Sequence, residues 1–408
     1  MAKEHLKFVV VGSVDHGKST LIGRFLYDTG SLPESQLQTI RKLAADAGEA
    51  VEFAFVLDHL EEERSRHITI DTAQTFFSSA SRDYVIIDAP GHKEFLKNMI
   101  TGASQASAAL LLLDVHEGLR EQTRRHAYMI SLLGIRQLIV VLNKMDKVDF
   151  SQQRFEEMST RMHELLGKLT LEHLAVIPAS ALRGDNIVKR SERMKWYDGP
   201  TVIEALDLLT PELADDTGPL RLPVQDVYDI DGQPVAVGRV ASGVIRPGEK
   251  LLAAPTDQLV TVAGLRKFEG PLESASAGES IGLTVEADRR LKRGLVLCPP
   301  DAPPAASQTL TANVFWMSPQ PLQHGEQLAL RLATQEVPCR VERIANRMDA
   351  GTLEIIQDQA DTLEDTEVAE VTLSATGPVA HDRFADIAEM GRLVLMRGAD
   401  IVAGGILP

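Results

Sequence analysis

Residues that could bind phosphate stand close together near the N-terminus, in the sequence GSVDHGKST at residues 12–20. This sequence fits the pattern G-x-x-x-x-G-K-[ST], in which backbone N–H groups, a lysine and a hydroxyl surround phosphate oxygens and a metal ion. An apolar run at residues 6–11 precedes it, and a helix-like segment at residues 20–27 follows it. A strand, a glycine-flanked loop and a helix in this order indicate a phosphate site rather than a chance match in a turn.

The residue types in this loop suit separate tasks. Gly12 and Gly17 allow backbone turns that a Cβ atom would forbid. Lys18 is expected to reach the β- and γ-phosphates of a nucleotide, and the Ser19 hydroxyl to complete a Mg²⁺ site. The nucleotide contacts expected from this segment are Gly12, Asp15, His16, Gly17, Lys18, Ser19 and Thr20.

Two later segments would complete a site that responds to the third phosphate. A long connection ends in Thr69, placed where the switch threonine of a GTPase binds Mg²⁺ and the γ-phosphate. The apolar run at residues 84–87 leads into the sequence DAPGH, in which Asp88 is expected to hold Mg²⁺ through water. Gly91 would donate its N–H to the γ-phosphate, and His92 would orient the attacking water. Taken alone, Thr69 fits a plain strand residue and His92 a solvated loop residue.

The identity of the base is indicated by the sequence NKMD at residues 143–146, which follows an apolar run at residues 137–142. Asp146 can accept hydrogen bonds from guanine N1–H and the 2-amino group, and adenine presents neither donor. A site built for such donors rejects the analogue that lacks them, because its carboxylate would be left unpaired. The stem of Lys144 is expected to lie over the base and Asn143 to brace the loop. The expected contacts to guanine O6 are the backbone amides of Ser180, Ala181 and Leu182.

The hydrophobic pattern divides the chain into three parts. Apolar strands alternate with helix-like segments up to residue 210, which is typical of an α/β nucleotide-binding domain. Beyond a polar stretch at residues 210–219, short strand candidates recur with turns between them. We predict an α/β P-loop GTPase domain followed by two all-β barrel domains. Their predicted bounds are residues 1–210, 219–302 and 307–408.

The composition of the chain indicates which partners and which cellular location to expect. Lys and Arg number 42 against 58 Asp and Glu, a formal net charge of −16. Nucleic acid is therefore not expected as a partner, although one basic patch on an acidic protein would still bind RNA. The two cysteines, Cys298 and Cys339, lack both a disulfide framework and metal-ligand spacing. Because no signal peptide or long apolar run is visible, we expect a cytoplasmic protein with no membrane partner.

Together, the phosphate loop, the threonine switch, D-x-P-G and N-K-x-D, with two β domains behind them, resemble the translational GTPase superfamily. The resemblance spans nearly all of the chain. It implies GTP/GDP and Mg²⁺ as cofactors, with Ser19, Thr69 and Asp88 around the metal and His92, Thr69 and Gly91 in hydrolysis. It also implies that Val14 and Ile68 form an apolar gate that His92 must pass to reach the water.

Two groups within this superfamily are candidates. The aminoacyl-tRNA carriers share the sequences at residues 89–92 and 97–102, and they also carry a histidine where His16 stands. Other segments look more like the GTPase subunit of sulfate adenylyltransferase, namely residues 12–15, 122–126, 133–136, 143–150, 184–186, 196–201 and 400–406. Both groups usually have glycine where His67 stands.

The resemblance to the sulfate adenylyltransferase subunit implies a regulatory GTPase. Its partner would be a separate catalytic subunit of a heteromeric ATP sulfurylase, which makes adenylyl sulfate and pyrophosphate from ATP and sulfate. GTP hydrolysis would drive that reaction through the switch segments. The alternative is an elongation-factor-like GTPase that carries aminoacyl-tRNA. A third possibility is a GTPase of this fold that serves another enzyme as a scaffold or switch.

Overall fold

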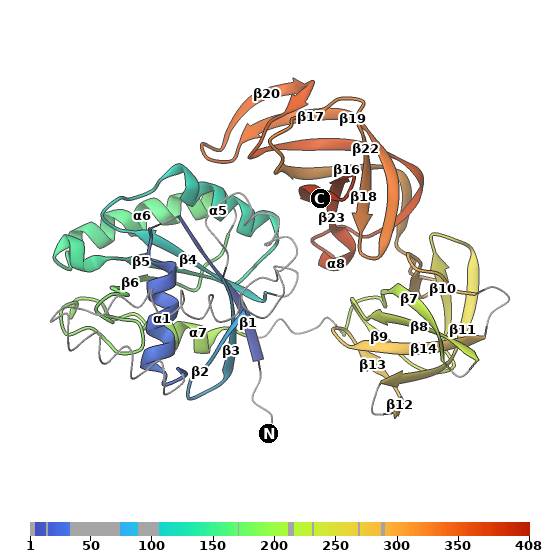
Figure 1. Cartoon of the computed structure of the whole chain (residues 1–408), viewed down its shortest axis with the longest axis horizontal. Helices are drawn as coiled ribbons and strands as arrows, with labels where there is room; N and C mark the ends of the chain where they lie inside the picture. Colours follow the sequence, from blue (N-terminus) through green and yellow to red (C-terminus); the bar gives the residue numbers. More distant parts are fainter. Residues whose placement is uncertain are drawn as a thin grey trace. The chain divides into compact units, whose positions relative to one another are not determined.

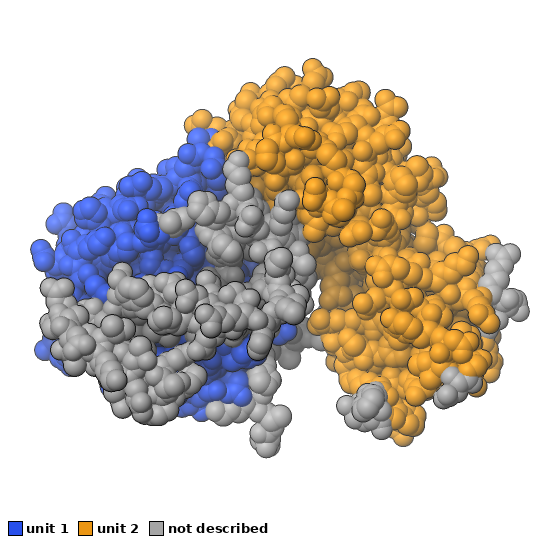
Figure 2. All heavy atoms as spheres, viewed as in Figure 1, with its two compact units in different colours: residues 1–211, 350–353 blue, residues 212–349, 354–408 orange. Residues whose placement is uncertain are grey.

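The computed structural model describes residues 5–13, 15–32, 74–88, 106–169, 171–210, 216–230, 232–267, 270–286 and 290–408 (Figure 1). The chain forms two compact units (Figure 2). Unit 1 comprises residues 1–211 and 350–353, and unit 2 comprises residues 212–349 and 354–408. Several predicted site residues lie outside the described residues: Val14, Ile68, Thr69, Gly91 and His92.

Unit 1 is built on a six-stranded sheet with the order β2-β3-β1-β4-β5-β6. Strand β2 pairs antiparallel with β3, and the other neighbours are parallel. Strands β4 and β5 are buried along their whole length, as their continuous apolar sequences indicate. The strands are β1 (His5–Gly12), β2 (Gln74–Ser78), β3 (Asp83–Asp88), β4 (Ala108–Asp114), β5 (Leu138–Asn143) and β6 (Ala175–Pro178).

Helices connect and cover these strands. Helix α1 follows β1 and buries Leu21, Ile22 and Phe25 in a cluster that contains Phe8 of β1 and Tyr84 of β3. This packing holds the start of α1 close to the end of β1. In the described part of unit 1 the helices are α1 (Lys18–Asp28), α5 (Glu121–Leu132), the 3₁₀ helix η2 (Met145–Val148), α6 (Gln152–Lys168) and α7 (Val202–Leu208).

Unit 2 contains two closed antiparallel barrels. The first barrel has the strand order β10-β15-β7-β8-β14-β11, and the pairing of β10 with β11 closes it. Its strands are β7 (Leu222–Ile230), β8 (Gln233–Arg239), β10 (Lys250–Ala254), β11 (Gln258–Lys267), β14 (Ser280–Glu286) and β15 (Val296–Cys298). The added pieces are β9 (Val244–Ile245), β12 (Gly270–Leu272) and β13 (Ala275–Ser276).

The second barrel has the order β18-β23-β24-β16-β22-β19 and is closed by the pairing of β18 with β19. Its strands are β16 (Ala305–Trp316), β18 (Gln327–Leu332), β19 (Gln335–Asp349), β22 (Glu367–His381), β23 (Arg392–Arg397) and β24 (Asp400–Ile406). The added pieces are β17 (Leu322–Gln323), β20 (Glu354–Ala360), β21 (Thr362–Leu363) and α8 (Ala388–Gly391). The predicted fold class, an α/β domain followed by two β-barrels, is confirmed.

Apolar and ionic contacts join the two barrels. Ala254, Val296 and Cys298 of the first barrel belong to the buried cluster of the second. Arg221 is only 3% exposed and forms a two-pronged ion pair with Asp382, with N–O distances of 2.7 and 3.0 Å. Its remaining nitrogen, Nη1, donates to the carbonyl oxygens of residues 220 and 302. Such a satisfied, planar arrangement is the strong form of a charge-assisted hydrogen bond.

Two smaller observations concern the cysteines and the membrane. Cys298 and Cys339 are both free thiols buried in unit 2. Within the described ranges, every helix is too short or too polar to cross a membrane.

Removal of the Arg221 side chain should destabilise unit 2. Arg221→Met leaves the carboxylate of Asp382, which is 15% exposed, without its cation, and such a loss costs about 3 kcal/mol or more of unfolding free energy. Urea unfolding measured by fluorescence tests this in a Trp196→Phe background, where the fully buried Trp316 is the only tryptophan left.

The matched control is Arg331→Met, because the pair between Arg331 and Glu336 is exposed on both sides, at 47% and 54%. An exposed pair contributes about 1 kcal/mol or less. Equal losses in the two variants would contradict the structural role given to Arg221.

Candidate nucleotide-binding site

The two glycines of the phosphate loop lie where no side chain fits. A Cβ atom on Gly12 would stand 2.8 Å from the carbonyl oxygen of Leu112 on the neighbouring strand. Gly17 has a φ of +90°, and a Cβ atom there would stand 2.6 Å from Nδ2 of Asn143. The loop therefore packs directly onto the ends of β4 and β5.

The N-terminus of α1, like that of α5, lacks the side-chain cap that α6 and α7 have. Ser151 caps α6, and Thr201 caps α7 in a reciprocal arrangement with Glu204. At α1 the capping position is Gly17, which has no side chain that could accept from the first N–H groups. The first N–H groups of a helix have no partner within the helix, so those of α1 suit a bound anion.

Lys18 lies across the loop rather than away from it. Its Nζ donates to the carbonyl oxygens of Gly12, at 2.6 Å, and Ser13, at 3.1 Å. These contacts keep a positive charge beside the N-terminus of α1, where phosphate oxygens are expected. Ser19 stands in the first turn of the same helix and is half-buried.

The residues predicted to bind Mg²⁺ are described only in part. Asp88 is the last residue of β3 and pairs in register with Val10 of β1, so its backbone lies one strand away from the phosphate loop. Mg²⁺ prefers oxygen ligands, and a carboxylate at that position and the Ser19 hydroxyl are groups of this kind. Thr69, the third predicted ligand, is outside the described residues.

Asn143 joins two loops across the site. Its Nδ2 donates to the carbonyl oxygen of His16 at 2.9 Å, and its Oδ1 accepts from the N–H of Ala181 at 2.9 Å. The side chain is 2% exposed, so both bonds are shielded from water. The phosphate loop and the segment at residues 180–182 are therefore fixed to the same strand end.

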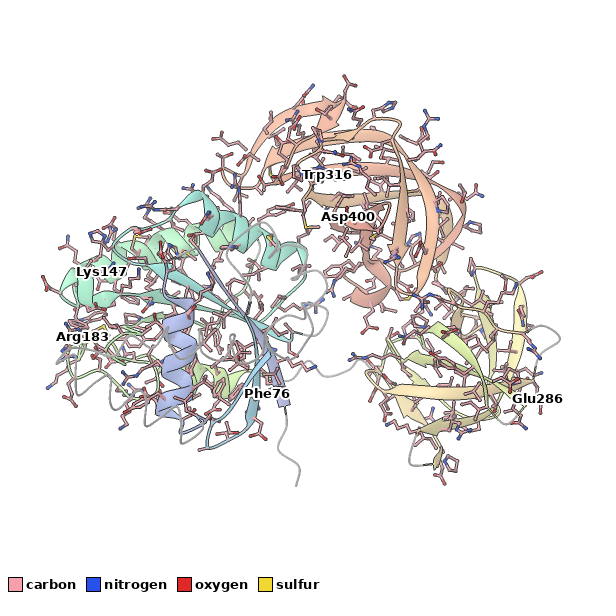
Figure 3. All side chains as sticks on the ribbon, in the orientation of Figure 1. Phe76, Lys147, Arg183, Glu286, Trp316 and Asp400 are labelled. Carbon is pink, nitrogen blue, oxygen red and sulfur yellow. The ribbon has the colours of Figure 1, made fainter. Side chains whose placement is uncertain are left out.

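Asp146 is held from the same segment. The Ser180 hydroxyl donates to its Oδ1 at 2.5 Å, and the N–H of Met145 donates to the carbonyl oxygen of Ala179 at 3.1 Å. A carboxylate can accept several hydrogen bonds, so this contact orients the group and leaves it able to accept from a base. Leu182, the last residue of the segment, is half-buried. Figure 3 labels Lys147 and Arg183, the exposed residues that follow Asp146 and Leu182 and mark where these loops reach the surface.

Lys144 has a φ of +65° and points back to the phosphate loop. Its Nζ donates to the carbonyl oxygen of Asp15 and forms an ion pair of 2.9 Å with Oδ2 of Asp114. Burial of Asp114 raises the pKa of its carboxyl, but Lys144 and two backbone N–H groups outweigh burial and hold this pKa below its usual value. Sequence reasoning missed Asp114. The sequence feature that could have identified it is its position, since Asp114 is a carboxylate at the end of an apolar strand, as Asp88 is at the end of β3.

The side chain of His16 does not lie on the open side of the loop. Its ring is fully buried, with Nδ1 donating to the carbonyl oxygen of Leu112 at 3.1 Å and Nε2 3.7 Å from Oε2 of Glu117. Burial lowers its pKa, although the neighbouring acidic groups oppose this effect. The main-chain groups of His16 also have partners, since its N–H donates to the carbonyl oxygen of Ser13 at 3.3 Å and its carbonyl oxygen accepts from Asn143.

All three parts of the chain match models of known families. Residues 3–212 match the elongation factor Tu GTP binding domain, residues 234–298 match elongation factor Tu domain 2, and residues 309–407 match the GTP-eEF1A C-terminal domain-like family.

Two elongation factors of similar length support the same assignment. Elongation factor 1-alpha of Archaeoglobus fulgidus is 40% identical over 413 residues, which cover 99% of this chain and 98% of the relative. Elongation factor 1-alpha of Pyrococcus furiosus is 40% identical over 420 residues and covers 99% of this chain and 98% of the relative. A crystal structure of Sup35 complexed with GDP covers 100% of this chain and 94% of its own, with 24% identity and a TM-score of 0.46.

These relatives correct the predicted partner. A catalytic subunit of sulfate adenylyltransferase was expected, and nucleic acid was not; both expectations are contradicted, because the relatives that match along 99% of the chain are elongation factors. Sulfate adenylyltransferase activity loses its support for the same reason. Several segments behind that prediction, such as residues 12–15 and 143–150, lie in the loops described above, so they report on nucleotide binding and not on a partner. The net charge of −16 was a poor guide to nucleic-acid binding, because a total charge does not show whether basic residues cluster on one surface.

GTP is the nucleotide of the matched domain, and the loops that would hold it converge on one edge of the sheet. The chain belongs to the translational GTPase superfamily, together with elongation factors Tu and 1-alpha.

Proposed function

We propose that this protein is a GTP-hydrolysing switch of the elongation factor 1-alpha type, which carries aminoacyl-tRNA in its GTP-bound state. The observation that carries the proposal is the 40% identity to an elongation factor 1-alpha along 99% of the chain, through both barrels as well as the GTP-binding domain. The proposal includes a cytoplasmic location and the three-domain division at residues 1–210, 219–302 and 307–408.

The described residues support specific roles in binding. The N–H groups at the start of α1 and the ammonium group of Lys18 bind the β- and γ-phosphates. Asp146, oriented by Ser180, accepts from the guanine N1–H and 2-amino groups. Asn143 holds the two loops together. Of the three N–H groups expected at guanine O6, that of Ser180 donates to the carbonyl oxygen of Asp185 and that of Ala181 to Asn143, so we assign the contact with O6 to the N–H of Leu182.

Hydrolysis depends on residues in and beyond the described ranges. Ser19, Thr69 and Asp88 hold Mg²⁺, which neutralises charge on the phosphates when it is bound. Gly91 donates its N–H to the γ-phosphate, and His92 orients the attacking water after passing a gate formed by Val14 and Ile68. Loss of the γ-phosphate releases Thr69 and Gly91, which changes the shape of the switch segments.

The carrier role needs a local basic surface, since the chain as a whole has a net charge of −16. Binding of tRNA through phosphate contacts falls steeply with salt concentration. The carrier role therefore predicts salt-dependent tRNA binding, which can be measured separately from GTP binding.

Loss of the phosphate-loop lysine should abolish most nucleotide affinity. Lys18→Ala removes the charge that the loop carbonyls hold beside α1, and we expect GTP affinity to fall about 100-fold, as measured by calorimetry. Lys168→Ala, at the far end of α6, is the control and should bind GTP as the unmodified protein does. Unchanged affinity in Lys18→Ala would remove this loop from the site.

The base preference should change in Asp146→Asn. An amide donates where the carboxylate accepted, so it pairs with the 2-oxo group of xanthine and no longer with the 2-amino group of guanine. We expect the affinity ratio of xanthosine to guanosine triphosphate to rise by about 100-fold or more in a competition assay. A retained preference for GTP would place the base elsewhere.

The carrier role is tested with aminoacyl-tRNA. With a non-hydrolysable GTP analogue, the protein should protect the aminoacyl ester from hydrolysis, and protection should weaken with added salt and disappear with GDP. Absence of protection in protein that binds GTP normally would refute the carrier role and leave the GTPase assignment in place.

A further inference from the structure

The main chain of the phosphate loop is held at two consecutive residues by the end of β5. Asn143 Nδ2 donates to the carbonyl oxygen of His16 at 2.9 Å, and Lys144 Nζ donates to the carbonyl oxygen of Asp15. Both acceptors precede Gly17, the capping residue of α1. The direction of the N–H groups that follow thus depends on how firmly these two side chains are fixed.

Asn143 is fixed by burial and by its second hydrogen bond, which it makes to Ala181. Lys144 has a more flexible side chain and needs a further partner to fix it. A lysine side chain has a flexible four-carbon stem and three rotatable donors, so one carbonyl partner does not fix it. Its ammonium group also contacts Asp114, with Nζ and Oδ2 2.9 Å apart. This carboxylate is the feature that restricts the lysine.

Asp114 itself has little freedom. Its side chain is fully buried at the end of β4, and its Oδ1 accepts from the N–H groups of His116, at 2.9 Å, and Glu117, at 3.3 Å. It pairs in register with Asn143, the residue before Lys144. Lys147 is a weaker partner of Asp114, since its Nζ lies 4.0 Å from Oδ2, the oxygen that contacts Lys144, and its side chain is 52% exposed.

The turn after Asp114 also approaches the phosphate loop. Glu117, whose N–H is bonded to Asp114, places Oε2 3.7 Å from Nε2 of the buried His16 ring. The end of β4 therefore reaches both Asp15 and His16, one through Lys144 and the other through Glu117.

We infer that Asp114 is a positioning residue for guanine nucleotide binding, whose buried carboxylate holds Lys144 and, through Lys144, the phosphate loop at Asp15. The inference rests on the guanine-nucleotide binding in the proposed function and adds a residue outside the four sequence motifs. Loss of the carboxylate frees the lysine stem that lies over the base and loosens the loop. Bound GDP and GTP then leave faster, while the choice of base, which belongs to Asp146, does not change.

The test is the dissociation rate of a fluorescent GDP analogue from the full chain. Asp114→Asn keeps the size of the side chain and an oxygen that accepts from the two N–H groups, but it loses the charge that faces Lys144. We expect dissociation about ten times faster than from the unmodified protein, with an unchanged preference for guanosine over xanthosine diphosphate. Asp207→Asn is the matched control, since that half-buried carboxylate accepts from Tyr84 and Ser79 and should leave the rate unchanged.

A double-mutant cycle separates positioning from a general structural effect. Lys144→Met alone should also speed dissociation, and adding Asp114→Asn to it should change the rate by less than about twofold, because the two residues act as one unit. Additive effects, or a normal rate in Asp114→Asn, would overturn the inference.

Folding is followed by thermal melting of each variant. If Asp114→Asn alone does not fold, the double variant, which removes both charges together, should fold, and failure of both would overturn the inference in favour of a purely structural carboxylate. Absence of binding by the unmodified protein would instead refute the proposed function itself.

Discussion

The arrangement of the parallel strands in the sheet of unit 1 is the constraint on which the site depends. Parallel strands end at one edge, and β1, β4 and β5 end there with Gly12, Asp114 and Asn143. The buried, apolar bodies of these strands fix where the ends stand, and the glycines allow the loop to lie directly on them. Polar side chains then act over short distances in a shielded place, where each hydrogen bond is worth more than it is in water.

Much of this arrangement could be predicted from the sequence. The four motifs are local patterns, and all except the threonine switch follow an apolar run that is recognisable as a strand. The position of Asp146 or Lys18 at the sheet edge could therefore be predicted without a structure. The contacts between strand ends were not readable. The ion pair of Asp114 with Lys144 joins residues from two strands, and the burial of the His16 ring depends on Leu112 and Glu117. Short-range patterns also indicated strands in unit 2 but not which pairs close each barrel, nor that Cys298 joins the core of the second barrel.

The wrong partner prediction has a related cause. Segments around the nucleotide loops keep a similar sequence because the chemistry of GTP demands similar residues at similar spacing. They consequently carry little information about what else the protein binds. Similarity along the whole chain, both barrels included, carries more, and it relates this protein to elongation factors.

The central claim is that this sheet edge forms one site selective for guanine nucleotides. Competition against a fluorescent GDP analogue bound to the full chain measures it most directly. The account predicts that GTP and GDP each displace the analogue completely, and that ATP fails to do so even at about a thousandfold higher concentration. Displacement by ATP at the concentrations that suffice for GTP would contradict the account, because Asp146 and its bond to Ser180 would then have no part in choosing the base.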